Sequence, residues 1–395
     1  MNWNKMLHQG KLTLLSAVLV AVSAWGMHAS PSQAASAATA VPACGTGDHG
    51  LLKELQARHA ASEETPLSFS DLQFLSADTG RAAGSGFMIG TSDGGCHFQE
   101  IYQGQWNFRQ IDFPNNVQGW ALASVKDTAA TYLIATTNGG STWTRIGNTA
   151  TDFERIDFKD SKRGFGYSRN ATSYTTDGGR TWSLIRTPAN TRSAEFTSRD
   201  KGYALVIAPG AGYRVMKTSN GGSTWSLSLQ SAFAYPESGR IYASGDQVYA
   251  LLYGGTGMSQ TSYSLYASSN KGGSWKRVIA QDSAGGGPAP GSGAAQLRSG
   301  PASGKPGNMQ LIGSSAAFLV GFSPAGEKVA VGRSYKGGKA WTNLPAIPGY
   351  EGMISFTGLK EGWMAVRGQN TSSLYSTGDG GSTWKLKFVF KGTGQ

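Results

Sequence analysis

Cysteine is scarce in this chain, with only Cys44 and Cys96 among 395 residues. No set of cysteines and histidines stands at metal-ligand spacing, so the sequence predicts no metal site. Cys44 with His49 and Cys96 with His97 would form a zinc set only if the two segments met. A disulfide between Cys44 and Cys96 is the simpler interpretation, and it would close a loop of about fifty residues. Two free thiols are the alternative.

Charged residues are also few, at 15% of the chain, whereas glycine accounts for 56 residues. This composition suits many short strands joined by tight turns and disfavours helices. General disorder is excluded because 39% of the residues are hydrophobic. No glycine-rich phosphate loop lies between a strand and a helix, so no nucleotide or other cofactor is predicted.

Long apolar runs are absent except near the N-terminus, where Leu12 to Trp25 follows Lys5 and Lys11. Residues 1–34 are predicted to be a signal peptide, with cleavage after Ser32-Gln33-Ala34, and a retained anchor is the alternative. The mature protein is therefore expected to be extracytoplasmic, either secreted or associated with the cell envelope. Removing residues 1–34 takes away two lysines and no acid, so the net charge of +11 becomes +9.

This positive charge favours acidic partners, namely a protein face, an anionic wall polymer or a lipid surface. Nucleic acid is also acidic, but it is the least favoured partner because the protein is expected to be exported. The alternative is that the charge only aids solubility. Cys44 follows Val41-Pro42-Ala43, which faintly resembles a lipoprotein cleavage box, but it stands far from the apolar run.

An eight-residue phrase of the form Thr/Ser-x-Asp/Asn-Gly-Gly-x-Thr-Trp recurs seven times with drift. Its copies are 91–98, 136–143, 175–182, 218–225, 268–275, 334–341 and 377–384. A second phrase precedes each first one: an apolar strand such as Ile111-Asp112-Phe113, a polar turn, and then Gly119-Trp120. Spacings near 40–45 residues indicate a propeller in which each repeat is one four-stranded blade.

The sequence thus predicts an all-β, seven-bladed β-propeller of four-stranded antiparallel blades over residues 67–391. The expected blades are 67–106, 107–150, 151–190, 191–232, 233–282, 308–348 and 349–391. A flexible Gly/Pro/Ser-rich insertion is expected at 281–307. The N-terminal linker, 35–66, is expected to carry a short helix from Asp48 to Ala61.

The repeated phrase resembles the Asp-box, or bacterial neuraminidase repeat. In that family the acidic side chain accepts hydrogen bonds within its own turn, and the tryptophan is buried by packing around the hairpin. The resemblance implies structural roles for Asp93, Asn138, Asp177, Asn220, Asn270 and Asp379. Lys336 departs from the pattern, which predicts a looser turn there. Recurrence in every repeat argues against catalytic roles, because one active site needs one copy of each group.

Asp-box propellers include sialidases and xyloglucan-cleaving hydrolases, so an enzyme must be considered. Phe108-Arg109-Gln110-Ile111 is similar to a sialidase arginine motif, but Phe153-Glu154-Arg155-Ile156 occupies the same place in the next repeat. Asp112, Asp157 and Glu195 recur on the expected innermost strands, where two carboxylates could act as acid and base. A polar channel lining, with Arg155 as a partner, is the preferred interpretation. The protein is therefore predicted not to be an enzyme.

The full repeat resembles the photosystem II stability/assembly factor family of seven-bladed propellers over about residues 67–391. The resemblance implies a chaperone-like role that holds a membrane protein or its precursor during assembly. We therefore expect a monomeric, non-catalytic scaffold or assembly factor that binds a protein partner. The alternative is a cell-surface propeller that binds or hydrolyses carbohydrate.

A binding face is expected where the loops differ between repeats. Between Arg145 and Lys217 there are 13 basic and 7 acidic residues. Arginine with tyrosine is common interface chemistry. The candidate binding residues are Arg169, Arg186, Arg192, Arg214 and Tyr213. A solvated rim of scattered arginines is the alternative.

Overall fold

Short antiparallel strands and tight turns make up the described part of the chain. The computed structural model describes residues 54–55, 57–58, 67–125, 128–169, 171–208, 210–257 and 259–391, all within the unit Cys44–Gln395. The predicted signal peptide and most of the linker lie outside these residues. Glu54, Leu55, Ala57 and Arg58 are helical, but the rest of the predicted helix lies outside the described residues, so it stays a prediction. Within the described ranges no helix has the length and apolar character needed to cross a membrane.

The strands have the following bounds in chain order. They are β1 (Phe69–Phe74), β2 (Gly80–Thr91), β3 (Gln99–Asp112), β4 (Gly119–Val125), β5 (Thr131–Thr136), β6 (Thr144–Arg145), β7 (Arg155–Phe158), β8 (Gly164–Tyr167), β9 (Thr172–Thr175), β10 (Ser183–Ile185), β11 (Thr191–Phe196), β12 (Gly202–Ala208), β13 (Gly212–Thr218), β14 (Ser226–Ser231), β15 (Ser238–Ser244), β16 (Gln247–Gly257), β17 (Gln260–Ser268), β18 (Lys276–Gln281), β19 (Lys305–Ile312), β20 (Ala316–Ser323), β21 (Lys328–Ser334), β22 (Thr342–Asn343), β23 (Ile347–Pro348), β24 (Glu351–Phe356), β25 (Gly362–Arg367), β26 (Thr371–Thr377) and β27 (Lys385–Lys391). Two short 3-10 turns, η1 (Pro301–Ser303) and η2 (Pro324–Gly326), interrupt them.

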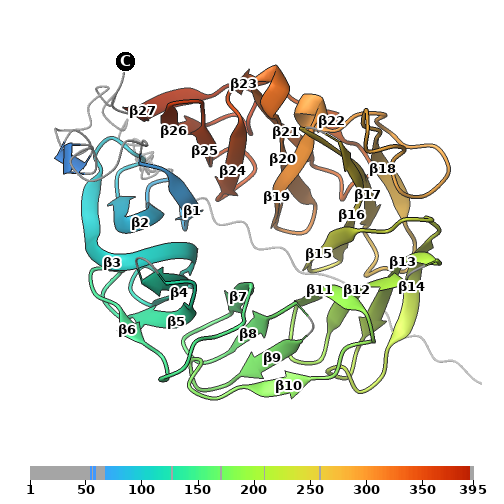
Figure 1. Cartoon of the computed structure of the whole chain (residues 1–395), viewed down its shortest axis with the longest axis horizontal. Helices are drawn as coiled ribbons and strands as arrows, with labels where there is room; N and C mark the ends of the chain where they lie inside the picture. Colours follow the sequence, from blue (N-terminus) through green and yellow to red (C-terminus); the bar gives the residue numbers. More distant parts are fainter. Residues whose placement is uncertain are drawn as a thin grey trace, which may run out of the picture. The chain divides into compact units, whose positions relative to one another are not determined.

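These strands form six antiparallel sheets in a closed propeller (Figure 1). In chain order the sheets are β1–β6, β7–β10, β11–β14, β15–β18, β19–β23 and β24–β27. The innermost strands contact one another in succession, β11 with β15, β15 with β19 and β19 with β24, and β1 contacts β24 to close the ring. Arg155 of β7 donates to the carbonyl oxygen of Ala194 of β11 at 2.8 Å, which continues the ring between those sheets.

The prediction of seven separate blades is wrong, because the first two repeats share one six-stranded sheet. The shared strand is β3, whose first part pairs with β2 (Gly90 opposite Gln99) and whose second part pairs with β4 (Asp112 opposite Trp120). The stretch 99–112 contains one glycine and no proline. Since no strong breaker ends the outer strand of the first repeat, it continues as the inner strand of the second. Register shifts within β3, between Glu100 and Gln110, let it bend between the two positions.

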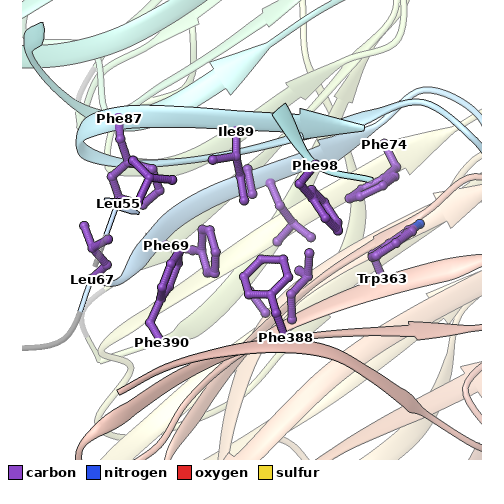
Figure 2. Close-up of a cluster of buried hydrophobic side chains, with 14 residues drawn as sticks. Leu55, Leu67, Phe69, Phe74, Phe87, Ile89, Phe98, Trp363, Phe388 and Phe390 are labelled. Carbon is purple, nitrogen blue, oxygen red and sulfur yellow. The ribbon is translucent and has the colours of Figure 1, made fainter. Parts of the chain in front are cut away.

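Aromatic side chains hold the first and last sheets together where the ring closes (Figure 2). Phe74 of β1 stacks on Trp363 of β25 with ring centroids 4.1 Å apart. The ring centroid of Phe69 lies 5.6 Å from that of Phe390 of β27, and Leu55 is buried in the same cluster. Because the ends of the propeller are far apart in sequence, this cluster, and not a shared strand, connects them.

The Gly/Pro/Ser-rich segment between β18 and β19 is bonded along its length to neighbouring sheets. Leu297 donates its N–H to Val278 and accepts from Ala280, both at 3.0 Å. The side chain of Arg277 donates to the carbonyl of Ala289 at 3.1 Å, and that of Gln296 donates to the carbonyl of Lys339 at 2.7 Å. The expected flexible insertion is thus part of the packed structure.

Cys96 is disulfide-bonded in the structure. Cys44, its predicted partner, lies outside the described residues, so the Cys44–Cys96 pairing stays a prediction. Among the described residues no group of histidine, cysteine and carboxylate side chains could hold a metal ion.

Candidate functional site

The acidic and amide side chains of the repeated phrase hold their own turns. In the turn between β9 and β10, Asp177 Oδ1 accepts from the backbone N–H of Thr181 at 2.9 Å, and Oδ2 accepts from the Thr181 hydroxyl at 2.6 Å. These two bonds lower the pKa of Asp177 to about 2. Asn138 makes the same pair of contacts, because its Oδ1 accepts from Thr142 N–H at 3.0 Å and its Nδ2 donates to the Thr142 hydroxyl at 2.9 Å. The structural role predicted for these side chains accounts for their contacts.

The turn at Lys336 has fewer of these bonds. Ser334 Oγ still accepts from the backbone N–H groups of Lys336 and Gly338, at 3.4 and 3.0 Å. A lysine has no side-chain oxygen, so the bonds that an aspartate would accept have no counterpart there. The glycines after the Asp or Asn have positive φ, for example 75° at Gly178, which explains why the phrase needs glycine there.

We expect Asp177→Asn to be tolerated and Asp177→Ala to destabilise the hairpin. Asparagine keeps the acceptor for the backbone N–H, and its amide can donate to the threonine hydroxyl, as Asn138 does; alanine leaves the Thr181 N–H without its partner. The thermal midpoint should fall by roughly 1–3 °C in the alanine variant and stay close to wild type in the asparagine variant. Differential scanning calorimetry near pH 7 checks this. Equal losses in both variants would show that the negative charge, and not the turn geometry, matters.

The innermost strands bear side chains that bind the free backbone edge of the next sheet or repeat. Gln110 Oε1 accepts from the N–H of Ile156 at 2.9 Å, while its Nε2 donates to the same residue's carbonyl at 2.8 Å. The same two-bond clamp recurs where Gln73 binds Phe113, Asn308 binds Ile354 and Gln310 binds Phe356. Asp112 contributes one such bond, accepting from Phe158 N–H at 2.5 Å. The Ile-x-Phe element therefore recurs because its backbone is the edge that the neighbouring side chains bind.

Three carboxylates on these strands, Asp71, Asp112 and Glu195, have pKa values raised by burial. Burial raises the pKa of Asp71 to about 7. Burial, together with the nearby negative charge of Asp157, raises the pKa of Asp112 to about 8. Glu195 pairs with Arg155 at 2.8 Å and Asp157 with Lys159 at 2.6 Å. The polar lining predicted from the sequence, with Arg155 as a partner, matches these contacts.

A pocket of 190 Å³ gathers four arginines from three consecutive sheets. Arg155 lies on β7, Arg169 on the loop between β8 and β9, Arg192 on β11 and Arg240 on β15. We call these four residues the arginine pocket. Glu154 is the acidic residue among those that line it. The pocket therefore concentrates positive charge beside the innermost strands.

The arginines differ in how they are held. The guanidinium of Arg155 lies 3.8 Å from the centre of the Tyr167 ring and pairs with Glu195. Desolvation lowers the pKa of Arg155, but the surrounding groups, Glu195 first and then Tyr167 and Asp157, together outweigh it and the net pKa is raised. Among described residues, Arg169 and Arg240 form no ion pair. Their donors remain to bind an anionic group.

The structure brings together two of the five candidate binding residues, Arg169 and Arg192. Arg186 lies after β10, where its carbonyl accepts from the Trp225 indole at 3.0 Å, and Arg214 is half-buried on β13; neither lines the pocket. The prediction of Tyr213 as a binding residue is wrong, because its side chain is 1% exposed. Its hydroxyl bonds to the carbonyl of Tyr253 and accepts from Glu237 N–H, so it supports the core.

Arg155 and Arg240 are not among the candidate arginines predicted from the sequence, although both line the pocket. Arg240 precedes Ile241 as Arg155 precedes Ile156, at the start of an innermost strand. This shared position in the repeat was the available signal. Only the arrangement of the sheets around the propeller shows that both side chains reach the pocket that Arg169 and Arg192 line.

No protein-family model matches the chain, and no curated protein matches its sequence. Among solved structures, a GH74 xyloglucanase from Xanthomonas campestris is 12% identical with a TM-score of 0.55; the match covers 83% of this chain and 55% of that one. The chain thus spans about half the length of that enzyme. The structure of YCF48 from Cyanidioschyzon merolae is 16% identical with a TM-score of 0.49, covering 80% and 96%. A structure of YCF48 bound to a D1 peptide is 15% identical with a TM-score of 0.48, covering 84% and 93%.

These identities are low, so what the xyloglucanase match supports is the propeller fold alone. Nothing further rests on the two YCF48 matches, whose TM-scores lie below 0.5. The prolyl endopeptidase match, at 11% identity and a TM-score of 0.53, likewise supports the fold.

Proposed function

We propose that this propeller is a non-catalytic binding protein that recognises an acidic segment of a protein partner through the arginine pocket. The observation that carries the proposal is the convergence of Arg155, Arg169, Arg192 and Arg240 from three sheets. A guanidinium binds a carboxylate through two parallel N–H···O bonds, which gives orientation as well as affinity.

The size of the pocket favours a narrow ligand. A volume of 190 Å³ admits one or two side chains but no folded element. An extended segment that presents an aspartate, a glutamate or a terminal carboxylate has the required shape and charge. Recognition of one segment suits a protein that holds its partner for a limited time.

The role that fits this binding is that of an extracytoplasmic assembly factor or scaffold, acting as a monomer on a membrane protein or its precursor. The predicted export signal at 1–34 and the positive net charge support the location and the acidic partner. The resemblance of the repeat to the photosystem II stability/assembly factor family supports the holding role.

The proposal is tested with the double variant Arg169→Glu/Arg192→Glu. Charge reversal at two positions should repel the acidic segment and reduce partner capture by more than about tenfold. Arg186→Glu is the control, because it reverses the charge of an arginine that lies between the two sheets in sequence, after β10, and does not line the pocket. The measurement is affinity capture from an extracytoplasmic membrane fraction with quantitative mass spectrometry.

Binding is then measured with a synthetic peptide from the captured protein, with its acidic residues intact or changed to amides. We expect capture to survive in the control variant and affinity to fall when the peptide loses its carboxylates. Undiminished capture by the double variant, with a folded ring by circular dichroism, would contradict the arginine pocket as the binding site.

A further inference from the structure

A second, larger pocket lies at the opposite ends of the same strands. It is a groove of 670 Å³ between the sheets β11–β14 and β15–β18. Its walls come from the β11–β12 turn, the end of β13 with the turn that follows it, and the β15–β16 and β17–β18 turns. The arginine pocket uses the β8–β9 loop and the beginnings of β11 and β15. The two pockets are therefore on different faces, and this inference does not depend on the proposed function.

The groove combines cationic, aromatic and hydroxyl groups. Its cations are Lys201, Lys217 and Lys271, and its aromatic side chains are Tyr203 and Trp225. The serine and threonine hydroxyl groups belong to Thr197, Ser198, Thr218, Ser219, Thr224 and Ser226.

Two of the lysines are available to a ligand. Within the described ranges, Lys201 and Lys217 form no ion pair. Lys271 Nζ lies 3.1 Å from Asp246 Oδ1, and Asp246 is the carboxylate among the lining residues. The groove therefore carries two ammonium groups in excess of its one acid.

Lys271 has an unusual backbone conformation for its residue type. Its φ is 57°, in the left-handed region that glycine occupies at lower cost. In the other six copies of the phrase the same position is glycine, with positive φ. These are Gly94, Gly139, Gly178, Gly221, Gly337 and Gly380. A lysine here lowers the stability of the turn, which points to a use for its side chain in the groove.

A matched groove elsewhere in the ring lacks the three lysines, and its cations are Lys162 and Arg180 at other positions. The groove between β4–β5 and the second sheet is formed by equivalent turns, and Trp120 stands where Tyr203 does. At the positions of Lys201, Lys217 and Lys271 it has Gln118, Ala135 and Gly178. The three lysines therefore distinguish this groove from the matched one and are not a constant part of the repeat.

We propose that this groove binds an acidic oligosaccharide, a glycan that carries uronate carboxylates. The apolar face of a sugar ring packs on an aromatic side chain, its hydroxyls exchange hydrogen bonds with the serines and threonines, and its carboxylates meet Lys201 and Lys217. The indole of Trp225 is held in place by its bond to the Arg186 carbonyl at 3.0 Å. A volume of 670 Å³ accommodates about two or three sugar rings. The hydroxyl-lined wall favours a sugar over an acidic peptide, which needs fewer hydroxyl partners.

The test titrates the full chain with trigalacturonate and follows binding by isothermal titration calorimetry. Maltotriose is the neutral probe of the same length, and triglutamate is the peptide probe of the same charge. Three variants are compared with the wild type: Lys201→Gln/Lys217→Gln, Lys271→Gly and Lys162→Gln. Lys162 lines the matched groove and serves as the control.

Trigalacturonate is expected to bind, and the double lysine variant to weaken binding by about tenfold or more. Lys271→Gly is expected to weaken binding about threefold while its thermal midpoint stays equal or rises, because glycine relieves the left-handed strain. Lys162→Gln is expected to bind like the wild type.

The proposal is overturned if trigalacturonate does not bind or if maltotriose binds equally well. It is also overturned if triglutamate binds more tightly, which would make the groove a peptide site, or if Lys162→Gln loses as much affinity as the double variant.

Discussion

Replacing Phe390 with alanine is expected to lower the free energy of unfolding by about 3–5 kcal/mol. Phe390 is 0% exposed and lies in the cluster that joins the first and last sheets (Figure 2). Its ring is 5.6 Å from that of Phe69 and 5.4 Å from that of Phe388. Alanine leaves a cavity between the first and last sheets, which no loop joins. The substitution therefore weakens the closure of the propeller as well as the packing of the cluster.

The matched control is Leu386→Ala on the same strand, β27. Leu386 is 49% exposed, so its truncation should change the free energy of unfolding by less than about 0.5 kcal/mol. Chemical denaturation followed by tryptophan fluorescence measures both variants. Similar small losses for the two would show that the ring is closed by something other than the aromatic cluster.

The second prediction concerns Asp112, whose replacement by asparagine should stabilise the protein at high pH. In the folded protein burial, reinforced by repulsion from Asp157, raises the pKa of Asp112 from 3.8 to about 8. Between these values the folded protein keeps a proton that the unfolded chain releases, so wild-type stability falls as pH rises from about 4 to about 8. The loss is complete above the folded pKa.

Asparagine removes this titration and keeps the acceptor for the Phe158 N–H. Its amide can also donate to the Phe158 carbonyl, as Asn308 does to Ile354. At pH 9 the variant should be more stable than wild type by about 1–3 kcal/mol, and at pH 4 the two should be close. Urea unfolding at pH 4, 6.5 and 9 measures the difference. A residual decline is expected from Asp71, whose pKa is also raised by burial, to about 7.

Asp160→Asn provides a control of opposite sign. Backbone hydrogen bonds from Arg163 and Lys162 lower the pKa of Asp160, so its contribution to stability is present above its unfolded pKa and is lost as pH falls. The free energy of unfolding of this variant should therefore be lower than that of the wild type at pH 6.5, and the two values should converge in strong acid. If Asp112→Asn followed the wild-type pH profile in parallel, the raised pKa of Asp112 would be refuted.

Local patterns in the sequence were enough to predict the all-β propeller and the role of its turns. The repeated phrase encodes bonds between residues two to four positions apart, such as those of Asp177 with Thr175 and Thr181. Such contacts are visible in a linear sequence because their spacing is constant. The same argument correctly placed Asp112, Asp157 and Glu195 on innermost strands.

Contacts between sheets could not be predicted in the same way. The partner of Gln110 is Ile156 and the partner of Gln310 is Phe356, and these pairs form only when the sheets are set side by side. Tyrosine near arginines is common interface chemistry, which predicts Tyr213 on the binding face, but the neighbouring sheet covers it. The number of sheets depended on β3, where the absence of a breaker merged two repeats.

The sequence by itself determined the fold class and the turn chemistry, because both depend on periodic, local interactions. Only the tertiary structure decided that there are six sheets, that Arg155 and Arg240 join Arg169 and Arg192, and that three lysines share one groove. These groupings bring together side chains from different sheets. Their proximity follows from the angle at which one sheet packs on the next, which no single repeat encodes.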